Sequence, residues 1–166
     1  MIDVFNRLAG EVLTRDISIL FISVGINDVL RIPDKNAPMS ISIPTREEYW
    51  LKIFEVLKKL NIKIIINDIL PTDETCSPSL FKQPDPIKWF NKDISTYNQY
   101  LENMCLRYKM PFSKRFDTWI QYPNIKELLI DAVHPTAKGH QMIAEHAFKE
   151  LMNRGWLEKS NHLIIK

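Results

Sequence analysis

Two residues near the end of the chain have the types and spacing of a catalytic pair. Asp131 and His134 are three positions apart in the stretch DAVHPTAKGH, just before a predicted helix. A carboxylate at this spacing can accept a hydrogen bond from one ring nitrogen, which fixes the tautomer and leaves the other nitrogen free as a general base. Histidine titrates in the right range for this role near neutral pH. The alternative is a helix-entry loop in which Asp131 is a local cap and His134 a surface residue.

A second polar group follows a very apolar segment. Gly25, Asn27 and Asp28 lie in the stretch FISVGINDVL, at the end of a predicted strand. The side-chain amide of an asparagine can donate a hydrogen bond to an oxyanion, which stabilises a transition state by about 3–4 kcal/mol in comparable sites. Asn and Asp also favour ordinary tight turns, so a turn without chemistry is the alternative.

The elements that must position these residues follow from hydrophobic spacing. In chain order, the pattern predicts helix 3–14, strand 17–24, helix 45–61, strand 62–69, helix 87–108, strand 111–116 and helix 136–152. Thr45 and Glu48 have the spacing of a capping box for the second helix, and Thr136 is the expected cap of the last one. The first two strands are nearly continuous apolar runs, which is typical of strands buried on both faces. The proline-rich segments 31–44 and 71–86 are predicted loops, and the length of the second suggests a substrate or lid function.

This alternation of helices and strands predicts an α/β domain with a parallel sheet. Functional sites in such sheets lie outside the carboxyl ends of the strands. The turn at Gly25–Asp28 follows the first strand, Asp117 follows the third, and the loop before the last helix can reach the same rim. The 166 residues suffice for one domain with a real core, so we predict a single domain over residues 1–166.

The composition excludes several other classes of function. The 22 basic and 20 acidic residues leave a net charge of +2, which gives no reason to expect nucleic acid as a partner. No apolar run is long enough to span a membrane, and no signal-peptide pattern follows Met1. The two cysteines do not form a CxxC pair, and His134, His140 and His146 fall on different helix faces, so no metal is expected. We therefore expect a cytoplasmic protein without a cofactor.

The two polar motifs in this order resemble the SGNH hydrolases, the GDSL-type esterases and lipases. The shared residues are Gly25-x-Asn27-Asp28 after a buried strand and Asp131-x-x-His134-Pro135 before the last helix. The resemblance implies a flavodoxin-like three-layer α/β/α sandwich and ester hydrolysis by a Ser-His-Asp triad on a small-molecule ester, without a cofactor. It implies that His134 is the base, Asp131 its orienting partner and Asn27 an oxyanion donor, with Gly25 and Asp28 supporting the turn.

The chain departs from this family at its beginning. The family's nucleophile lies in a Gly-Asp-Ser motif on the first strand, and no such motif occurs here. By this alignment the chain is an N-terminally truncated domain that lacks the serine, one oxyanion glycine and the first strand. Strand 17–24 would then have an unpaired apolar edge, and we expect poor solubility or a homodimer through it. Ser23 lies within that strand and is expected to be too buried to replace the missing serine.

Two other classes of function remain open at this stage. A non-catalytic descendant could keep the fold and bind a ligand or a partner at the same rim. An unrelated flavodoxin-like phosphate or nucleotide binder would need a glycine-rich phosphate loop after a strand, and the chain has only four glycines, none in such a loop. We therefore predict an SGNH-type ester hydrolase with a non-catalytic binding protein as the alternative.

Overall fold

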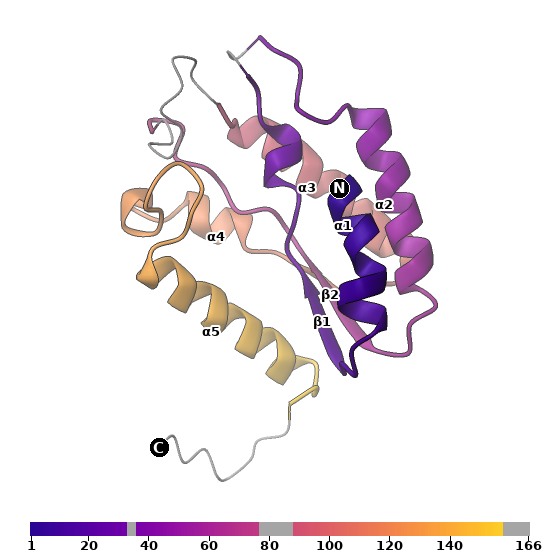
Figure 1. Cartoon of the computed structure of the whole chain (residues 1–166). Coiled ribbons are helices and arrows are strands. Elements are labelled where there is room, and N and C mark those ends of the chain that lie inside the picture. The colour runs from indigo at the N-terminus through magenta and orange to yellow at the C-terminus, as the bar shows by residue number, and fades with distance from the viewer. Residues whose placement is uncertain (33–35, 77–87, 158–166) are drawn as a thin grey trace.

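A small parallel sheet organises the chain. The computed structural model describes residues 1–32, 36–76 and 88–157 (Figure 1). Among these residues the sheet has three strands in the order β1-β2-β3, with bounds Ile19–Ile22, Lys63–Asn67 and Phe112–Ser113. β1 and β2 pair in parallel with Leu20 opposite Ile64, and β2 and β3 pair in parallel with Ile66 opposite Phe112. All three predicted strands are present, but each is shorter than the apolar run that predicts it.

The helices connect the strands as the alternation predicts. The described helices are α1 (Ile2–Leu8), the π-helical turn η1 (Ala9–Leu13), the 3₁₀ turn η2 (Ile26–Val29), α2 (Ile43–Leu57), α3 (Asn91–Tyr108), α4 (Phe116–Ile120), the 3₁₀ turn η3 (Ile125–Glu127) and α5 (Ala137–Asn153). α4, η3 and η2 are short and have no apolar period, so the sequence pattern misses them. Part of the predicted loop 71–86 lies outside the described residues. The predicted helix 87–108 begins later than expected, because residues 88–90 are not helical and α3 starts at Asn91.

The N-terminal cap was predicted from the sequence for both α5 and α2, and the structure differs from the prediction at α2. Thr136 caps α5 as expected, because its hydroxyl accepts a hydrogen bond of 3.1 Å from the backbone nitrogen of Gly139. The predicted cap of α2 is wrong, since α2 begins earlier and Ser42 caps it by accepting a hydrogen bond of 3.3 Å from the nitrogen of Thr45. Pro44 fits within the first turn of a helix, where no backbone N–H is needed, so Ser42 can start the helix ahead of it.

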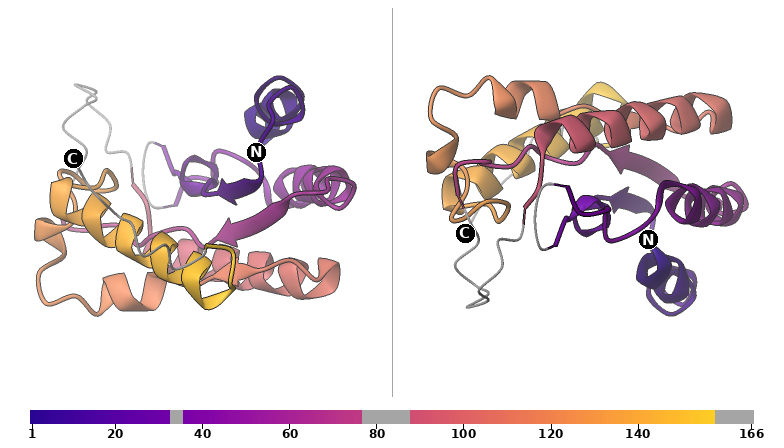
Figure 2. Two further views of the ribbon diagram at one scale, coloured as in Figure 1. Left: turned by 90° about the horizontal axis from the view of Figure 1, so that it is seen from below. Right: turned by 90° about the horizontal axis from the view of Figure 1, so that it is seen from above.

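The helices form two layers around the strands. α1 packs on α2 through Phe5 and Tyr49, whose ring centroids are 5.9 Å apart, and α2 packs on α3 through Phe54 and Tyr108, 4.9 Å apart. α5 lies on the other side of β1 and β2 from α2 in all three views (Figures 1 and 2). This arrangement is the predicted three-layer α/β/α architecture, built on a parallel sheet of three strands.

Burial differs between the two longer strands. Residues Ile64–Asn67 of β2 are buried, and Ile64 and Ile66 belong to one core cluster with buried residues of α2 and α3. In β1 only Ile22 is buried, whereas residues 19–21 are partly exposed. The expectation that strand 17–24 is buried on both faces is therefore wrong in part. The physical reason is that β1 pairs with β2 along one edge and, within the described part of the chain, with no strand along the other.

A smaller apolar cluster supports the segment between α4 and α5. Trp119, Leu128 and Leu129 form its buried centre, and Met142 and Ile143 of α5 pack against it. Trp119 is a core residue, with an exposed fraction of only 2%. None of the described helices combines the length and the apolar character needed to cross a membrane.

Candidate active site

Asp131 and His134 form a hydrogen-bonded pair in the loop before α5. Nδ1 of His134 lies 2.9 Å from Oδ2 of Asp131. An ionised carboxylate only accepts hydrogen bonds, so in the neutral ring this contact places the proton on Nδ1 and leaves Nε2 unprotonated. The side chain of Asp131 is buried, whereas that of His134 is 57% exposed. The imidazole is therefore oriented by a buried carboxylate while most of the ring stays accessible.

The backbone of the same loop also binds Asp131. Its Oδ1 atom accepts hydrogen bonds from the backbone nitrogens of Val133 at 2.9 Å and His134 at 2.8 Å. Burial by itself would raise the pKa of Asp131, but these two N–H groups and the imidazole outweigh it and lower the pKa below its usual value. The carboxylate is thus held in the ionised form that the imidazole needs as a partner.

The turn that carries Asn27 starts directly after β1. Gly25 has φ of 122°, a left-handed conformation that side chains rarely adopt, and it begins the 3₁₀ turn η2. A Cβ atom at this position would lie 2.8 Å from Ile69 and 2.9 Å from Tyr97. Asn27 is exposed, and no hydrogen bond within the described segments uses its side-chain amide. The amide is consequently free to donate to a bound group.

Asp28 anchors this turn in the core. Its Oδ2 atom accepts a hydrogen bond of 2.9 Å from the hydroxyl of Tyr97, and its Oδ1 atom lies 2.9 Å from the amino group of Met1. The Tyr97 hydroxyl in turn accepts a hydrogen bond of 2.6 Å from Nε1 of Trp50. Burial and the neighbouring charge of Asp28 raise the pKa of Tyr97 far above its usual value, so the phenol remains a donor. The sequence motif predicts Asp28 as the brace, but Tyr97 and Trp50 were not predicted as its partners.

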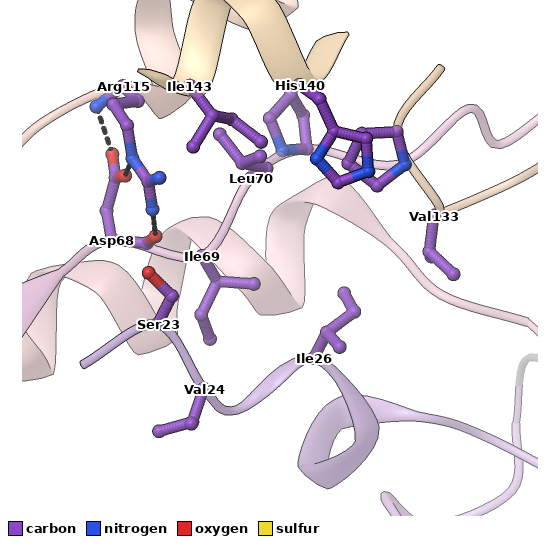
Figure 3. A pocket seen from close by; sticks show the side chains of 12 residues that line it. Ser23, Val24, Ile26, Asp68, Ile69, Leu70, Arg115, Val133, His140 and Ile143 are labelled. Carbon is purple, nitrogen blue, oxygen red and sulfur yellow. Dashed lines mark hydrogen bonds and ion pairs between the residues drawn. The ribbon is translucent and has the colours of Figure 1, made fainter. Parts of the chain in front are cut away.

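The two segments border one cavity of about 290 Å³ (Figure 3). Val24 and Ile26, which flank Gly25, line it from the end of β1, and Val133 and Pro135, which flank His134, line it from the loop before α5. Asn27 and His134 are not themselves lining residues, and no contact joins their side chains in the structure. The walls are mainly aliphatic, which suits an apolar group of modest size.

Two charged residues that were not predicted as part of the site, Asp68 and Arg115, line one side of the cavity. Asp68 follows β2 and accepts a hydrogen bond of 2.6 Å from the backbone nitrogen of Arg115 (Figure 3). It accepts another of 2.6 Å from the backbone nitrogen of Phe116. Nε of Arg115 lies 3.3 Å from Oδ1 of Asp68. Burial raises the pKa of Asp68 and lowers that of Arg115, while their opposite charges favour the ionised pair. This buried pair ties the end of β3 to the end of β2.

Ser23 lies where β1 leaves the sheet. The residue is exposed, and its hydroxyl accepts a hydrogen bond of 2.6 Å from Nδ2 of Asn67. The expectation that Ser23 is buried is therefore wrong, because the strand ends at Ile22 and its outer edge is open. The side chain is engaged with Asn67, and no histidine contacts it among the described residues.

The two histidines of α5 differ in position, since His140 lines the cavity of about 290 Å³ and His146 does not. Nε2 of His146 lies 2.8 Å from the hydroxyl of Ser113, which holds α5 against β3. Burial lowers the pKa of His146, and the charge of Arg115 adds to this effect. Asp117, at the start of α4, is exposed. In the part of the chain that the structure describes, no group of three or more His, Cys, Asp or Glu residues is arranged to hold a metal ion.

Comparisons with known proteins identify similar folds and a family. The chain resembles two crystal structures, the lipase/acylhydrolase from Enterococcus faecalis and a GDSL-like lipase from Bacteroides thetaiotaomicron. The first has a TM-score of 0.72 and 19% identity, with 96% of this chain and 73% of that chain covered. The second has a TM-score of 0.70 and 20% identity, with 90% of this chain and 69% of that chain covered. No curated protein sequence matches the chain.

At these identities the solved structures establish a common fold. The family assignment comes from the sequence profile of the GDSL-like lipase/acylhydrolases, which matches residues 2–147 and so includes both the turn with Asn27 and the pair Asp131–His134. The chain therefore belongs to the GDSL-like lipase/acylhydrolase family.

Proposed function

We propose that this chain supplies the general base, its orienting carboxylate and an oxyanion donor to a serine ester hydrolase acting on small-molecule esters. The observation that carries the proposal is the contact of 2.9 Å between Nδ1 of His134 and the buried carboxylate of Asp131. This contact leaves Nε2 of an accessible imidazole as the proton acceptor. The free side-chain amide of Asn27 stands on the other segment that borders the same cavity.

The proposed reaction follows from these positions. A serine hydroxyl attacks the ester carbonyl and transfers its proton to Nε2 of His134, while Asp131 stabilises the imidazolium that forms. The amide of Asn27 donates to the oxyanion of the tetrahedral intermediate. The protonated His134 then gives its proton to the leaving alcohol. Water releases the acyl group from the serine in a second round that uses the same base.

In this proposal the nucleophilic serine lies outside residues 1–166, because these residues contain no Gly-Asp-Ser motif. We propose that a segment preceding α1 carries it and pairs with the free edge of β1. α1 packs beside α2, in the layer that holds both crossover helices of the sheet. A strand that connects to β1 through α1 by the usual right-handed crossover would lie on the free side of β1. About three tenths of each solved neighbour lies outside the matched part, since 73% and 69% of their chains are covered.

A cavity at this edge supports the same placement. It measures about 330 Å³ and lies between α1–η1 and β1; its lining residues are Val4, Arg7, Leu8, Glu11, Val12, Leu20, Phe21, Ile22, Ser23 and Val24. Ser23 and Val24 also line the first cavity, so both cavities border the carboxyl end of β1. A parallel strand placed there would end beside Gly25 and Asn27, where the reaction requires a serine.

A non-catalytic function is the second candidate, because the sequence has no Gly-Asp-Ser motif. In that case the aliphatic cavity of about 290 Å³ would bind a small ligand without turnover. The free edge of β1 would then be a contact for another protein or a second copy of this chain.

Labelling with a fluorophosphonate distinguishes these functions, since this reagent modifies only an activated serine. The intact mass would be measured for residues 1–166 and for a form extended by the residues encoded upstream. We expect one adduct on the extended form, strongly slowed by His134→Ala, and none on the short form. An unlabelled extended form, or labelling that does not depend on His134, would contradict the hydrolase and support the binding function.

A further inference from the structure

The backbone carbonyl of Ala132 connects the loop of the candidate base to the segment that follows β2. Ala132 lies between Asp131 and His134 in the chain and is buried. Its oxygen accepts a hydrogen bond of 2.7 Å from the hydroxyl of Thr72 and one of 3.0 Å from the backbone nitrogen of Asp73. Thr72 is only 3% exposed. Both donors therefore act inside the core, where a lost partner is costly.

Thr72 is itself held by a side chain of α3. The Oδ1 atom of Asn91 accepts a hydrogen bond of 2.8 Å from the nitrogen of Thr72, and Nδ2 of Asn91 donates one of 2.9 Å to the oxygen of Thr72. Asn91 is the first residue of α3, and its backbone nitrogen donates to Glu74 at 2.6 Å. The side-chain amide of Asn91 thus holds the backbone of Thr72 through two hydrogen bonds. The hydroxyl of Thr72 in turn holds the carbonyl of Ala132.

The other hydrogen bonds of the loop are local. Within the described residues, the nitrogens of Val133 and His134 bind Asp131, and the oxygen of His134 accepts from Ile130. These contacts shape the loop but do not attach it to the sheet. Thr72 and Asp73 make the only hydrogen bonds between residues 131–134 and a distant part of the described chain.

We propose that Thr72 is a positioning residue for His134, acting through the carbonyl of Ala132. The inference gives the proposed catalytic pair a support in the segment that follows β2, and it rests on the proposed function for its relevance to catalysis. Without the hydroxyl, the loop can shift relative to the sheet, and the orientation of Asp131 toward Nδ1 of His134 is less well defined. A hydrolase needs this orientation, because a small misplacement of a base slows proton transfer strongly.

The test uses the chain of residues 1–166 with Thr72→Val, which keeps the shape and removes the hydroxyl. Thr72→Ser keeps the hydroxyl and is the matched control. The readout is the pair of imidazole ¹⁵N resonances of His134, assigned by their absence in His134→Ala and measured where the ring is neutral. We expect widely separated resonances in the wild type and in Thr72→Ser, as for a ring protonated on Nδ1, and convergence of the two resonances in Thr72→Val.

Identical ¹⁵N resonances in the wild type and Thr72→Val would overturn the proposal, since a purely structural threonine would not change the tautomer. If Thr72→Val does not fold, Asn91→Asp replaces it, because the carboxylate still accepts from the nitrogen of Thr72 but cannot donate to its oxygen. Partial convergence in Asn91→Asp supports the proposal, and none contradicts it. Converged resonances together with no phosphonate labelling of the extended form would leave the positioning role standing and refute the hydrolase.

Discussion

Tyr97 of α3 donates a hydrogen bond of 2.9 Å to the carboxylate of Asp28, the residue that follows Asn27. This contact attaches the turn after β1 to α3, the helix that connects β2 to β3 along the chain. The Tyr97 hydroxyl also accepts from Trp50 of α2 at 2.6 Å, so one buried oxygen joins three segments of the chain.

Removal of this hydroxyl should destabilise the protein. Tyr97→Phe leaves the indole N–H of Trp50 without its acceptor and takes one donor from Asp28, in a region without solvent. We expect a loss of about 1–3 kcal/mol in the free energy of unfolding, measured with urea. Tyr100→Phe is the matched control on the same helix, because the Tyr100 hydroxyl makes only a long contact of 3.4 Å with the oxygen of Glu47. Equal losses in both variants would contradict the bracing role of Tyr97.

A side chain at Gly25 should be poorly tolerated. Gly25→Ala would combine φ of 122° with a Cβ atom 2.8 Å from Ile69. We expect a loss of about 1–3 kcal/mol in urea unfolding and a displaced Asn27. Gly10→Ala is the control, since no atom lies within 4 Å of its Cβ position and φ is not left-handed. That variant should be neutral or more stable by up to about 1 kcal/mol, because alanine favours helices. A fully stable Gly25→Ala variant would show that the turn is not constrained in this way.

The carboxylate of Asp131 should stabilise the folded state in a pH-dependent manner. Burial would raise its pKa, but the N–H groups of Val133 and His134 and the imidazole lower it below the value in the unfolded chain. A group with a depressed folded pKa contributes stability above its unfolded pKa, about 3.9, and loses it as pH falls through the folded value.

The difference in unfolding free energy between the wild type and Asp131→Asn should therefore be larger near about pH 6 than near about pH 3. Urea titrations at the two pH values measure it. Asp117→Asn provides the control, because Asp117 is exposed, and its effect should be small at both pH values. A difference for Asp131→Asn that does not change with pH would refute this account of the carboxylate.

The free edge of β1 should make residues 1–166 self-associate when nothing else covers it. The edge is flanked by the cavity of about 330 Å³ that Phe21 lines, and exposed apolar strand edges promote pairing. We expect dimers or larger species in gel filtration with light scattering. Phe21→Lys should shift the population to monomers, because it puts a charge at the edge. Leu106→Lys is the control, since Leu106 is an apolar residue on α3 with 72% exposure. A stable wild-type monomer would contradict the prediction.

Local features of the site could be predicted from the sequence, because they depend on residues close in the chain. The spacing of Asp131 and His134 brings their side chains together at 2.9 Å, and Thr136 caps the following helix. The prediction of the α2 cap failed because Ser42 and Thr45 are both good N-cap residues. Which of them caps the helix depends on where the preceding loop joins it.

Contacts between distant residues could not be predicted in the same way. Tyr97 meets Asp28 across 69 positions, and Thr72 meets Ala132 across 60 positions. Neither spacing carries a period or a motif, since these contacts arise only once the strands have paired. The exposure of Ser23 was missed for a related reason, because an apolar run does not reveal that one edge of its strand is unpaired.

The central claim is that His134 is the base of an ester hydrolase whose nucleophile lies on a segment preceding α1. Its most direct test is the hydrolysis of p-nitrophenyl acetate by residues 1–166 and by the upstream-extended form, each with His134→Ala. His146→Gln is the control histidine, since its ring binds Ser113. The account predicts turnover only in the extended form, a loss of kcat of at least about a thousandfold with His134→Ala, and little change with His146→Gln. Turnover by residues 1–166 that survives His134→Ala would contradict it.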